Sequence, residues 1–398
     1  MRLLAINQFY APDLSATSQL LTQLCEDLAE LGDDVSVIAS RGSYLGGGSL
    51  PAREELNGVT VMRPWATGFG KRTIAHRLAD YGSFWAGAVA TAVRAQRPDV
   101  MLVLSTPPMI AFGAALVSAA RSVPLVSWVQ DVYPEVALAF GVLREGHPAS
   151  HALRGMNRFC HRVAAIHVAL ADDMAARLTA QGLSRDQIRV VHNWADAAAV
   201  HPVERASNGF RREHGLEGKF VAMYSGNIGQ GHDVATLAEA ARKLAHTNIE
   251  FVIIGEGARK AEAVELTNNL PRVRFLPYQP RECLAESLSA ADIHLVSLRA
   301  GLEGLLVPSK VYGIMAAGRP VAYLGPRSSE VARLIEHHRI GWAGRPGQSS
   351  ELAAVLEDLS QRPDEASAMG ARAREALCAE YDRPHAVRRW RDVLLDAI

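Results

Sequence analysis

Residues 301–325 read GLEGLLVPSKVYGIMAAGRPVAYLG, and this order predicts a glycine-containing loop, a short helix and a buried strand. We expect the helix to open at Pro308 and Ser309, because a serine hydroxyl at the N-cap accepts a hydrogen bond from a free N–H of the first turn. Lys310 follows at once, where a cation opposes the helix dipole at a cost of about 0.3–1 kcal/mol. That placement favours a bound anion, whose oxygens would meet backbone N–H groups and the ammonium together. The alternative is that Lys310 extends into solvent from a frayed turn.

Apolar segments of strand length alternate with helical patterns along the rest of the chain. In the first half, strands are expected near residues 3–9, 35–39, 59–62, 100–104, 125–129, 166–169 and 188–191. In the second half, they are expected near residues 220–224, 251–254, 273–275, 293–296 and 321–324. Apolar strands that alternate with helices are typical of parallel sheets covered on both faces. The predicted fold class is therefore α/β, with two doubly wound Rossmann-like domains facing each other across a cleft.

A chain of 398 residues is longer than one ordinary hydrophobic core, and two domains of about 100–200 residues are the default. The strand–helix pattern weakens between residues 196 and 218. We therefore expect an N-terminal domain over residues 1–198 and a C-terminal domain over residues 199–383. The tail, residues 384–398, predicts a helix with one apolar face.

The composition is that of a soluble globular protein, with 48% hydrophobic and 21% charged residues. Lys plus Arg and Asp plus Glu number 42 each, so a basic excess for nucleic-acid binding is absent. Four cysteines lie far apart without a CxxC motif and read as free thiols of a reducing cytosol. The apolar N-terminus is too short for a signal peptide, and prolines interrupt the uncharged run 100–120. We expect a cytoplasmic protein.

The run PSKVYGIMAAGRPV, residues 308–321, resembles the donor-site segment of GT-B glycosyltransferases of the family 4 type. Within that family, GLEGLLVPSK, GNIGQGHD and QDVYPE resemble bacterial enzymes that add fucose-like or N-acetylfucosamine-like sugars during O-antigen, capsule or colanic acid assembly. The resemblance implies the GT-B fold, a retaining reaction and a nucleotide-sugar donor. It also implies that the C-terminal helix, residues 384–398, crosses back onto the N-terminal domain.

The donor side is expected at turns that follow strands of the C-terminal domain. Glycines in GNIGQGHD let the backbone approach a ligand, so Gly226, Asn227 and Gly229 are candidates for the donor diphosphate, together with Ser309 and Lys310. A tight turn without a ligand would look similar. The family resemblance places Gly255 and Glu256 near the nucleotide base. The matching family loop often carries an arginine after its first glycine and a lysine near its end, and their absence raises the importance of Lys310.

The largest departure from the family concerns two glutamates that usually stand eight positions apart. The second position is Gly313 here, and the first would be Leu305 by strict count. Glu303 lies two residues upstream and is our candidate for contact with the donor sugar. Gly313 implies that the ribose is held by another group. The alternative is that Glu303 is a solvated loop carboxylate.

The acceptor side is expected in the N-terminal domain. Asp131 follows the predicted strand 125–129 and is a candidate for orienting or deprotonating the acceptor hydroxyl, with Glu135 as a second candidate. Asp131 could instead cap the following turn. Many relatives carry histidine where Gln130 stands. In the first loop, Asp13 could bind the acceptor or cap a turn, and the small Ser15 would permit close approach of the backbone.

A mixture of cations and aromatics follows the third predicted strand, residues 59–62. Its members are Arg63, Trp65, Phe69, Lys71, Arg72, His76, Arg77, Tyr81, Phe84 and Trp85. This segment is either a membrane-surface patch for a lipid-linked acceptor or core aromatics with a solvated basic face.

The favoured hypothesis is a retaining glycosyltransferase with a UDP- or GDP-sugar donor, a lipid-linked saccharide acceptor and no further cofactor. Asp131, Glu303 and Lys310 are its candidate catalytic residues. The chain contains no Asp-x-Asp, so we expect no metal requirement. The first loop, residues 10–17, contains no glycine, which argues strongly against a dinucleotide oxidoreductase. A sugar-nucleotide 2-epimerase and a non-catalytic partner subunit stay open as alternatives.

Overall fold

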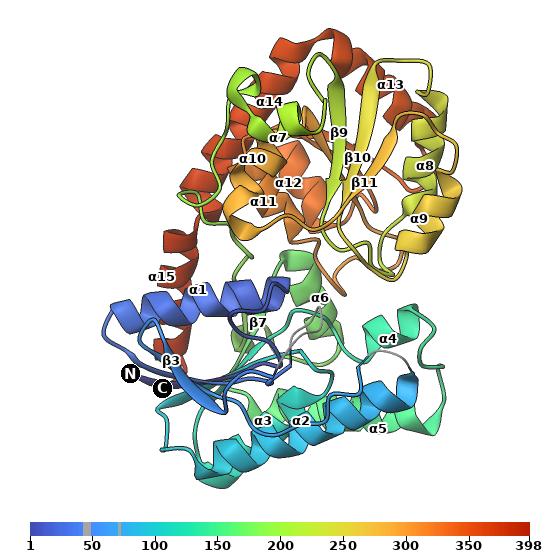
Figure 1. The fold of residues 1–398 in the computed structure, drawn as a ribbon. Coiled ribbons are helices and arrows are strands. Elements are labelled where there is room, and N and C mark those ends of the chain that lie inside the picture. Colours follow the sequence, from blue (N-terminus) through green and yellow to red (C-terminus); the bar gives the residue numbers. More distant parts are fainter. Residues whose placement is uncertain (43–48, 71–72) are drawn as a thin grey trace. The chain divides into compact units, whose positions relative to one another are not determined.

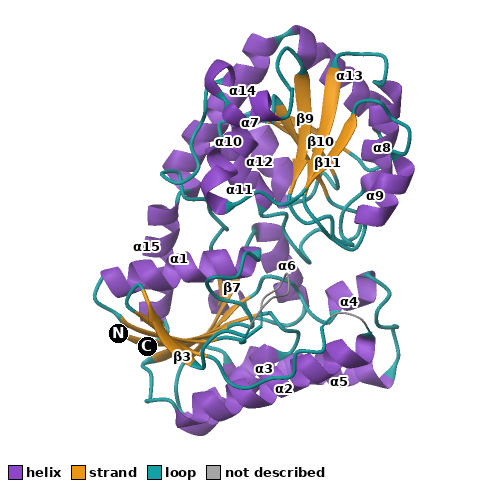
Figure 2. Ribbon diagram, in the orientation of Figure 1, coloured by secondary structure: helices purple, strands orange, loops and turns teal. Residues whose placement is uncertain are grey.

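The computed structural model describes residues 1–42, 49–70 and 73–398. The chain forms two compact units, Met1–His192 with Pro384–Ile398, and Asn193–Arg383. In each unit helices cover both faces of a sheet (Figure 1, Figure 2). The two doubly wound domains expected from the sequence are therefore confirmed, and the cleft between them stays a prediction.

The sheet of the first unit has eight strands in the described residues, in the order β3-β4-β2-β1-β5-β6-β7-β8. Neighbouring strands pair in parallel except for β3 and β4. The strands are β1 (Arg2–Ile6), β2 (Asp34–Ile38), β3 (Arg53–Leu56), β4 (Val59–Met62), β5 (Val100–Leu104), β6 (Leu125–Trp128), β7 (Ile166–Ala169) and β8 (Ile188–Val190).

Helices lie on both faces of this sheet, with α1 and α15 on one face and α2, α3 and α5 on the other (Figure 2). The helices are α1 (Ala16–Glu30), α2 (Ile74–Arg94), α3 (Ile110–Arg121), α4 (Glu135–Ala139), α5 (Pro148–Val163), α6 (Asp172–Ala180) and α15 (Arg383–Asp396). One apolar core joins the sheet to α2, α3 and α5, and its buried members include Val103, Phe84, Ala114 and Cys160.

The sheet of the second unit has six parallel strands in the described residues, in the order β11-β10-β9-β12-β13-β14. The strands are β9 (Phe220–Ser225), β10 (Ile249–Ile254), β11 (Val273–Leu276), β12 (Ile293–Ser297), β13 (Val321–Leu324) and β14 (Gly341–Gly344). The helices are α7 (Gly209–Glu213), α8 (Val234–Lys243), α9 (Lys260–Leu266), α10 (Leu284–Ser289), α11 (Lys310–Ala316), α12 (Glu330–His338), α13 (Ser349–Gln361) and α14 (Pro363–Ala376). Because all strands run in one direction, their carboxyl ends meet at a single edge of the sheet.

The boundary between the units lies earlier than the one expected after residue 198. Residues that follow His192 are bonded to the end of the second unit. The backbone N–H of Ala197 donates to Oδ1 of Asp382 over 2.9 Å, and Asp196 pairs with Arg383 at 3.0 Å. These contacts assign residues 193–198 to the second unit. The sequence-based boundary relied on a weakened strand pattern, which does not reveal contacts with residues 382 and 383.

The C-terminal helix α15 packs within the first unit. The ring of Trp390, which is fully buried, lies 4.4 Å from the ring of Trp128 on β6, centroid to centroid. Arg391 pairs with Asp33 at 3.2 Å. One aromatic and one charged contact thus fix this helix on the sheet of the first unit.

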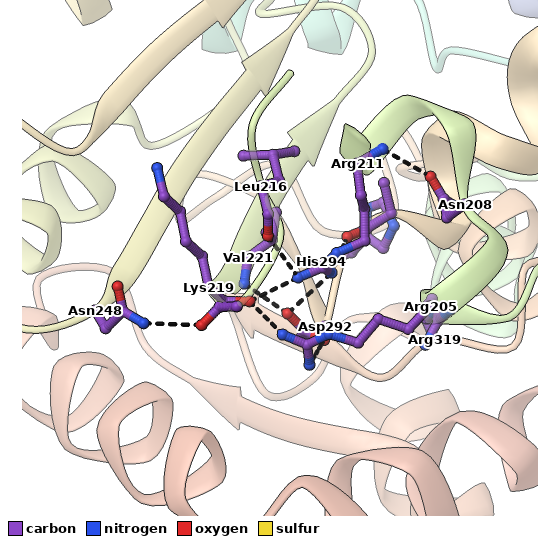
Figure 3. A network of polar contacts seen from close by, with 12 residues as sticks. Arg205, Asn208, Arg211, Leu216, Lys219, Val221, Asn248, Asp292, His294 and Arg319 are labelled. Carbon is purple, nitrogen blue, oxygen red and sulfur yellow. Dashed lines mark hydrogen bonds and ion pairs between the residues drawn. The ribbon is translucent and has the colours of Figure 1, made fainter. Parts of the chain in front are cut away.

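A polar network centred on Asp292 lies at the amino end of β12 (Figure 3). Its carboxylate accepts hydrogen bonds from the N–H of Val221, from Arg205 and from Arg211, at 2.7, 2.9 and 3.2 Å. Arg211 is 2% exposed and also donates to the carbonyl oxygens of Ala290, Leu216 and Lys219. This network ties α7 and the segment before β9 to the sheet, at the edge opposite to the carboxyl ends of the strands.

Two strands were absent from the sequence-based prediction. The charged strand β3 forms a hairpin with β4 through Asn57 and Gly58, which both have positive φ. Asn-Gly is a strong hairpin signal and could have revealed it. The other strand is β14, whose two glycines weaken its pattern. Among the described residues, no helix has the length and apolar character needed to span a bilayer.

Candidate active site

Two glycine-containing turns lie side by side at the carboxyl ends of β9 and β10. Gly226 follows β9, and its N–H donates to the carbonyl oxygen of Ile254 over 2.9 Å. Gly255 and Gly257 follow β10 with φ of 136° and 154°, and a Cβ at either residue would overlap the backbone of the first turn. Only glycine permits this close approach. The predicted contacts of Gly226 with the donor diphosphate and of Gly255 with the nucleotide base stay predictions.

The side chain of Lys310 reaches this surface from the start of α11. Its Nζ lies 3.6 Å from the centroid of the Tyr224 ring, and a Cβ placed on Gly226 would lie 3.6 Å from the same nitrogen. Nζ is buried and has no hydrogen-bond partner in the part of the chain that the structure describes. Desolvation lowers the pKa of this amine well below its ordinary value. The alternative in which Lys310 extends into solvent is therefore wrong.

Other polar groups around Lys310 are engaged in holding the turns. The Nδ1 atom of His232 lies 2.7 Å from the carbonyl oxygen of Ser297, and burial together with the charge of Lys310 lowers the pKa of this histidine to about 3. Arg259 donates to the carbonyl of His232 and pairs with Glu262. Among the described residues, Lys310 is thus a lysine of this edge whose Nζ is buried without a hydrogen-bond partner, and such a perturbed group in a glycine-lined turn is a candidate for ligand binding.

Some donor-side expectations are corrected. Ser309 precedes α11, but its side chain makes no capping hydrogen bond, because its backbone is already helical with φ of −63° and ψ of −18°. The side chain of Asn227 is exposed, and the predicted contacts of Asn227 and Gly229 with the donor diphosphate stay predictions. Glu256 is exposed and pairs with Lys260 at 2.5 Å, and its contact with a nucleotide base stays a prediction.

Glu303 lies in the loop between β12 and α11, the loop that also leads to Lys310. Its Oε2 accepts a hydrogen bond from the N–H of Gly301 over 2.8 Å, which is a contact within the loop. Leu305, at the strict family spacing, is buried in the core. At Gly313 an added Cβ would meet Leu288 at an ordinary 3.6 Å, so a Cβ itself would fit at this position.

In the first unit, Asp131 lies in the turn after β6. Burial raises the pKa of its carboxyl group to about 6, and its backbone N–H donates to Oγ of Ser105 over 3.2 Å. Helix α4 begins at Glu135 with Pro134 as its N-cap, so Asp131 does not cap that helix. A carboxyl group with a pKa of about 6 in a partly buried turn has the properties of a general base.

The remaining acceptor-side candidates have structural contacts. Oε1 of Glu135 lies 3.4 Å from Nε of Arg154, in an ion pair next to the turn of Asp131. Oδ1 of Asp13 accepts a hydrogen bond from the N–H of Ser15 over 2.8 Å, which is the turn-forming role left open by the sequence. The hydroxyl of Ser15 is buried without a hydrogen-bond partner among the described residues. Their binding roles stay predictions.

The sequence analysis missed one aromatic ring and one imidazole at the carboxyl ends of the strands in the second unit. Tyr224 is the penultimate residue of β9, in a run that reads as apolar core, and His232 lies in the turn GNIGQGHD, of which only Gly226, Asn227 and Gly229 were candidates. His167, a buried polar residue within the apolar strand β7, was also missed. A histidine inside an otherwise apolar strand is a signal that could have identified it.

Comparison with known proteins assigns both halves of the chain. Residues 16–194 match the family model of the glycosyl transferase 4-like domain, and residues 207–376 match that of the glycosyl transferases group 1. The chain is built from two glycosyltransferase domains. This glycosyltransferase is 28% identical to the probable glycosyltransferase WbjE of Pseudomonas aeruginosa over 78% of each chain. It is 25% identical to the putative colanic acid biosynthesis glycosyl transferase WcaI of Escherichia coli K12, over 84% of this chain and 86% of the relative.

Solved structures resemble this glycosyltransferase in fold. Anabaena HepE, in complex with UDP and glucose, aligns with a TM-score of 0.75 at 16% identity over 100% of both chains. Sucrose-phosphate synthase from Thermosynechococcus elongatus aligns with a TM-score of 0.77 at 14% identity over 99% of this chain and 98% of the other. The GT-B fold expected from the resemblance is therefore confirmed.

Proposed function

We propose that this glycosyltransferase transfers a sugar, with retention, from a nucleoside diphosphate donor to a lipid-linked saccharide during surface polysaccharide synthesis. The observation that carries the proposal is the buried Nζ atom of Lys310, which has no hydrogen-bond partner among the described residues and lies beside Gly226. A relative named for colanic acid biosynthesis supports the process, and a HepE structure in complex with UDP and glucose supports a UDP-linked donor. The family resemblance favours a deoxyhexose or an N-acetylated deoxyhexose on UDP or GDP.

The chemistry follows from electrostatic stabilisation of the leaving group. As the bond between sugar and diphosphate breaks, negative charge grows on the diphosphate, and the Lys310 ammonium with the N–H groups of the glycine turns would stabilise that charge. Asp131 would accept or orient the proton of the acceptor hydroxyl. Glu303 would contact the donor sugar. None of these steps uses a protein nucleophile, and we propose that none requires a metal.

The test is a calorimetric titration with UDP and with GDP, first without metal and then with magnesium. Micromolar binding of one nucleotide without metal, lost in Lys310→Ala, is the expected result. Binding that survives Lys310→Ala would place the diphosphate elsewhere. Incubation of a donor without acceptor checks the alternative, because a 2-epimerase would convert the donor sugar to its epimer. Absence of nucleotide binding would favour a non-catalytic partner subunit.

We also propose peripheral contact with the inner face of the membrane through the loop before α2. Trp65 and Phe69 are 68% and 55% exposed. Asp80 holds this loop by accepting hydrogen bonds from Phe69 and Gly70 at 3.0 and 2.9 Å. Lys71 and Arg72 lie outside the described residues. Co-sedimentation with phosphatidylglycerol vesicles should fall in a Trp65→Ala/Phe69→Ala variant, and unchanged sedimentation would refute the contact.

A further inference from the structure

The turn between β9 and α8, residues 226–233, has its central carbonyl groups fully engaged in hydrogen bonds. The six consecutive carbonyl oxygens that accept such a bond are those of Asn227, Ile228, Gly229, Gln230, Gly231 and His232. Apart from one bond within the turn, the donors are Tyr224 on β9, Arg259 after β10 and Arg299 after β12. The turn is therefore fastened to three neighbouring elements of the second unit.

The N–H groups of the same turn are used much less. Those of Asn227, Gly229 and Gln230 donate to no group in the part of the chain that the structure describes. Because a trans peptide is planar, the N–H of a residue points opposite to the carbonyl of the residue before it. The carbonyls of Ile228 and Gly229 are bonded to the protein, so the N–H groups of Gly229 and Gln230 point away from those contacts. Gly229 is half-buried and Gln230 is exposed, so a ligand can reach this part of the turn.

Arg299 holds the tip of this turn with two hydrogen bonds. Its backbone N–H donates to the carbonyl of Gly231 over 2.8 Å, and its Nη1 donates to the carbonyl of Gln230 over 3.2 Å. Among the described residues no carboxylate pairs with this exposed guanidinium, whereas the guanidinium of Arg259 pairs with Glu262. The side chain of Arg299 is therefore directed at the backbone of the turn, and its bond fixes the peptide between Gln230 and Gly231.

A separate observation, on another element, points to an anion at the same turn. Nζ of Lys310, at the start of α11, would lie 3.6 Å from a Cβ on Gly226 and has no hydrogen-bond partner among the described residues. A buried amine without a partner needs a counter-charge, and free N–H groups of successive residues form a concave site for anions. These two features lie at the start and at the tip of one turn, and a diphosphate has two phosphate groups to match them.

We propose that Arg299 is a positioning residue for donor binding, which holds the tip of the turn so that the N–H groups of Gly229 and Gln230 face a phosphate of the donor. The inference rests on the proposed function, because it takes the anion to be the diphosphate of a nucleotide sugar. Arg299 acts through the backbone and does not itself contact the phosphate. A glycine turn with a fixed tip thereby replaces the arginine and lysine that the matching family loop often carries.

The experiment compares the full-length wild type with Arg299→Met and Arg299→Lys in calorimetric titrations. The probe is whichever of UDP and GDP the wild type binds. Arg299→Met keeps an unbranched stem and loses the donor to the carbonyl of Gln230, so the affinity should fall about five- to tenfold. Arg299→Lys should recover most of this loss, because an ammonium of similar reach can donate to the same carbonyl.

Two further readouts separate positioning from a direct charge contact and from a general loss of structure. In protein labelled with 15N-glycine, saturating nucleotide should shift the amide signal of Gly229 in the wild type and in Arg299→Lys, and much less in Arg299→Met. The slope of log Kd against log salt should stay nearly the same in Arg299→Met, since no charge that contacts the phosphate is removed. Arg327→Met is a matched control, because Arg327 is 62% exposed in the same unit and pairs with Glu336 at 3.7 Å. It should leave the affinity unchanged.

The other outcomes overturn separate statements. An affinity of Arg299→Met within twofold of the wild type would overturn the inference, and so would a Gly229 signal that nucleotide does not move in the wild type. A clearly shallower salt slope in Arg299→Met would make Arg299 a direct phosphate ligand and would also overturn it. In each of these cases the proposed function stands if binding is lost in Lys310→Ala. Absence of UDP and GDP binding in the wild type would overturn the proposed function, and this inference with it.

Discussion

Replacing Lys310 with methionine should stabilise the ligand-free protein and remove its affinity for a nucleoside diphosphate. The Nζ atom is buried beside the ring of Tyr224 and has no hydrogen-bond partner among the described residues. Methionine keeps an unbranched stem of similar length and needs no partner. The substitution therefore removes an uncompensated polar group from the free protein and removes the cation from the proposed complex.

The magnitude follows from the cost of burying the amine. Desolvation lowers the pKa of Lys310 well below its ordinary value, and each tenfold change in the protonation equilibrium corresponds to about 1.4 kcal/mol. Loss of the contact with Tyr224 offsets part of the gain, so we expect a net stabilisation of about 1–2 kcal/mol. In a unit of this size that is a rise in Tm of about 2–8 °C. Loss of a charged hydrogen bond to the diphosphate, about 1.5–3 kcal/mol, would raise Kd about 10- to 150-fold.

The stabilisation should also depend on pH in one direction. Between the lowered pKa of Lys310 in the folded protein and the ordinary value of 10.5, the unfolded chain binds more protons than the folded chain. The free energy of unfolding of the wild type therefore rises with pH across that window. Lys310→Met lacks this dependence. The difference in free energy of unfolding between Lys310→Met and the wild type is largest below the lowered pKa and shrinks as pH approaches 10.5.

The assay combines thermal unfolding at two pH values with calorimetric titration of UDP and GDP. Lys243→Met is a matched control, because Lys243 is a half-exposed lysine of the same unit that pairs with Glu239 at 3.7 Å. The control should leave Tm and nucleotide affinity nearly unchanged. A Lys310→Met variant that binds nucleotide within threefold of the wild type, or that unfolds at a lower temperature, would refute the reasoning.

Three further predictions concern other parts of the molecule. Asp292→Ala should lower the free energy of unfolding by about 3–5 kcal/mol in urea denaturation, because it leaves the buried Arg211 without its counter-ion; an unchanged midpoint would contradict this. Gly257→Ala should cost about 1–3 kcal/mol and weaken nucleotide binding in calorimetry, because its Cβ would overlap the backbone of Ile228. If Asp131 acts as a base, the transfer rate should rise with pH through about 6 and the Asp131→Asn variant should lack this rise in a pH–rate profile.

The architecture of both units could be predicted because their parallel strands are buried on both faces. Val100–Leu104 is fully buried over five residues and reads as a continuous apolar run in the sequence. The hairpin strand β3 carries charged residues and was missed, since an edge strand need not be apolar. Its Asn57-Gly58 turn was the available signal.

The candidate site could be predicted in part. The order of Ser309 and Lys310 in the sequence indicated an anion site, but the reason differs from the expected one. Ser309 makes no capping hydrogen bond. The stronger argument is the burial of the Lys310 ammonium over Tyr224, a residue more than eighty positions earlier in the chain. Contacts between residues so distant in sequence depend on the order of strands in the sheet, which a single sequence does not specify.

For the acceptor-side candidates, the sequence gives the residue type but not the local contacts of the side chain. Asp13 and Glu135 are residue types that could bind a saccharide, yet in the structure they form a turn and an ion pair. The sequence shows that both residues carry a carboxylate, but the groups next to each carboxylate in the fold decide whether it is available to bind a saccharide. His167 could have been noticed as a histidine within an apolar strand, but the burial of its Nε2 without a hydrogen-bond partner among the described residues depends on the fold.

Comparison of two buried cations in the second unit explains why we assign function to only one of them. Arg211 is 2% exposed and is held by Asp292 and by three carbonyl oxygens, so its charge is offset within the fold and its removal affects stability. Nζ of Lys310 is also buried, but in the part of the chain that the structure describes it lies over the ring of Tyr224 and has no hydrogen-bond partner. A buried amine without a partner destabilises the folded protein. If Lys310 had no function, an apolar residue at this position would therefore give a more stable protein. Because Lys310 lies beside Gly226, where a backbone can approach a ligand closely, our proposal takes the missing counter-charge from a bound diphosphate.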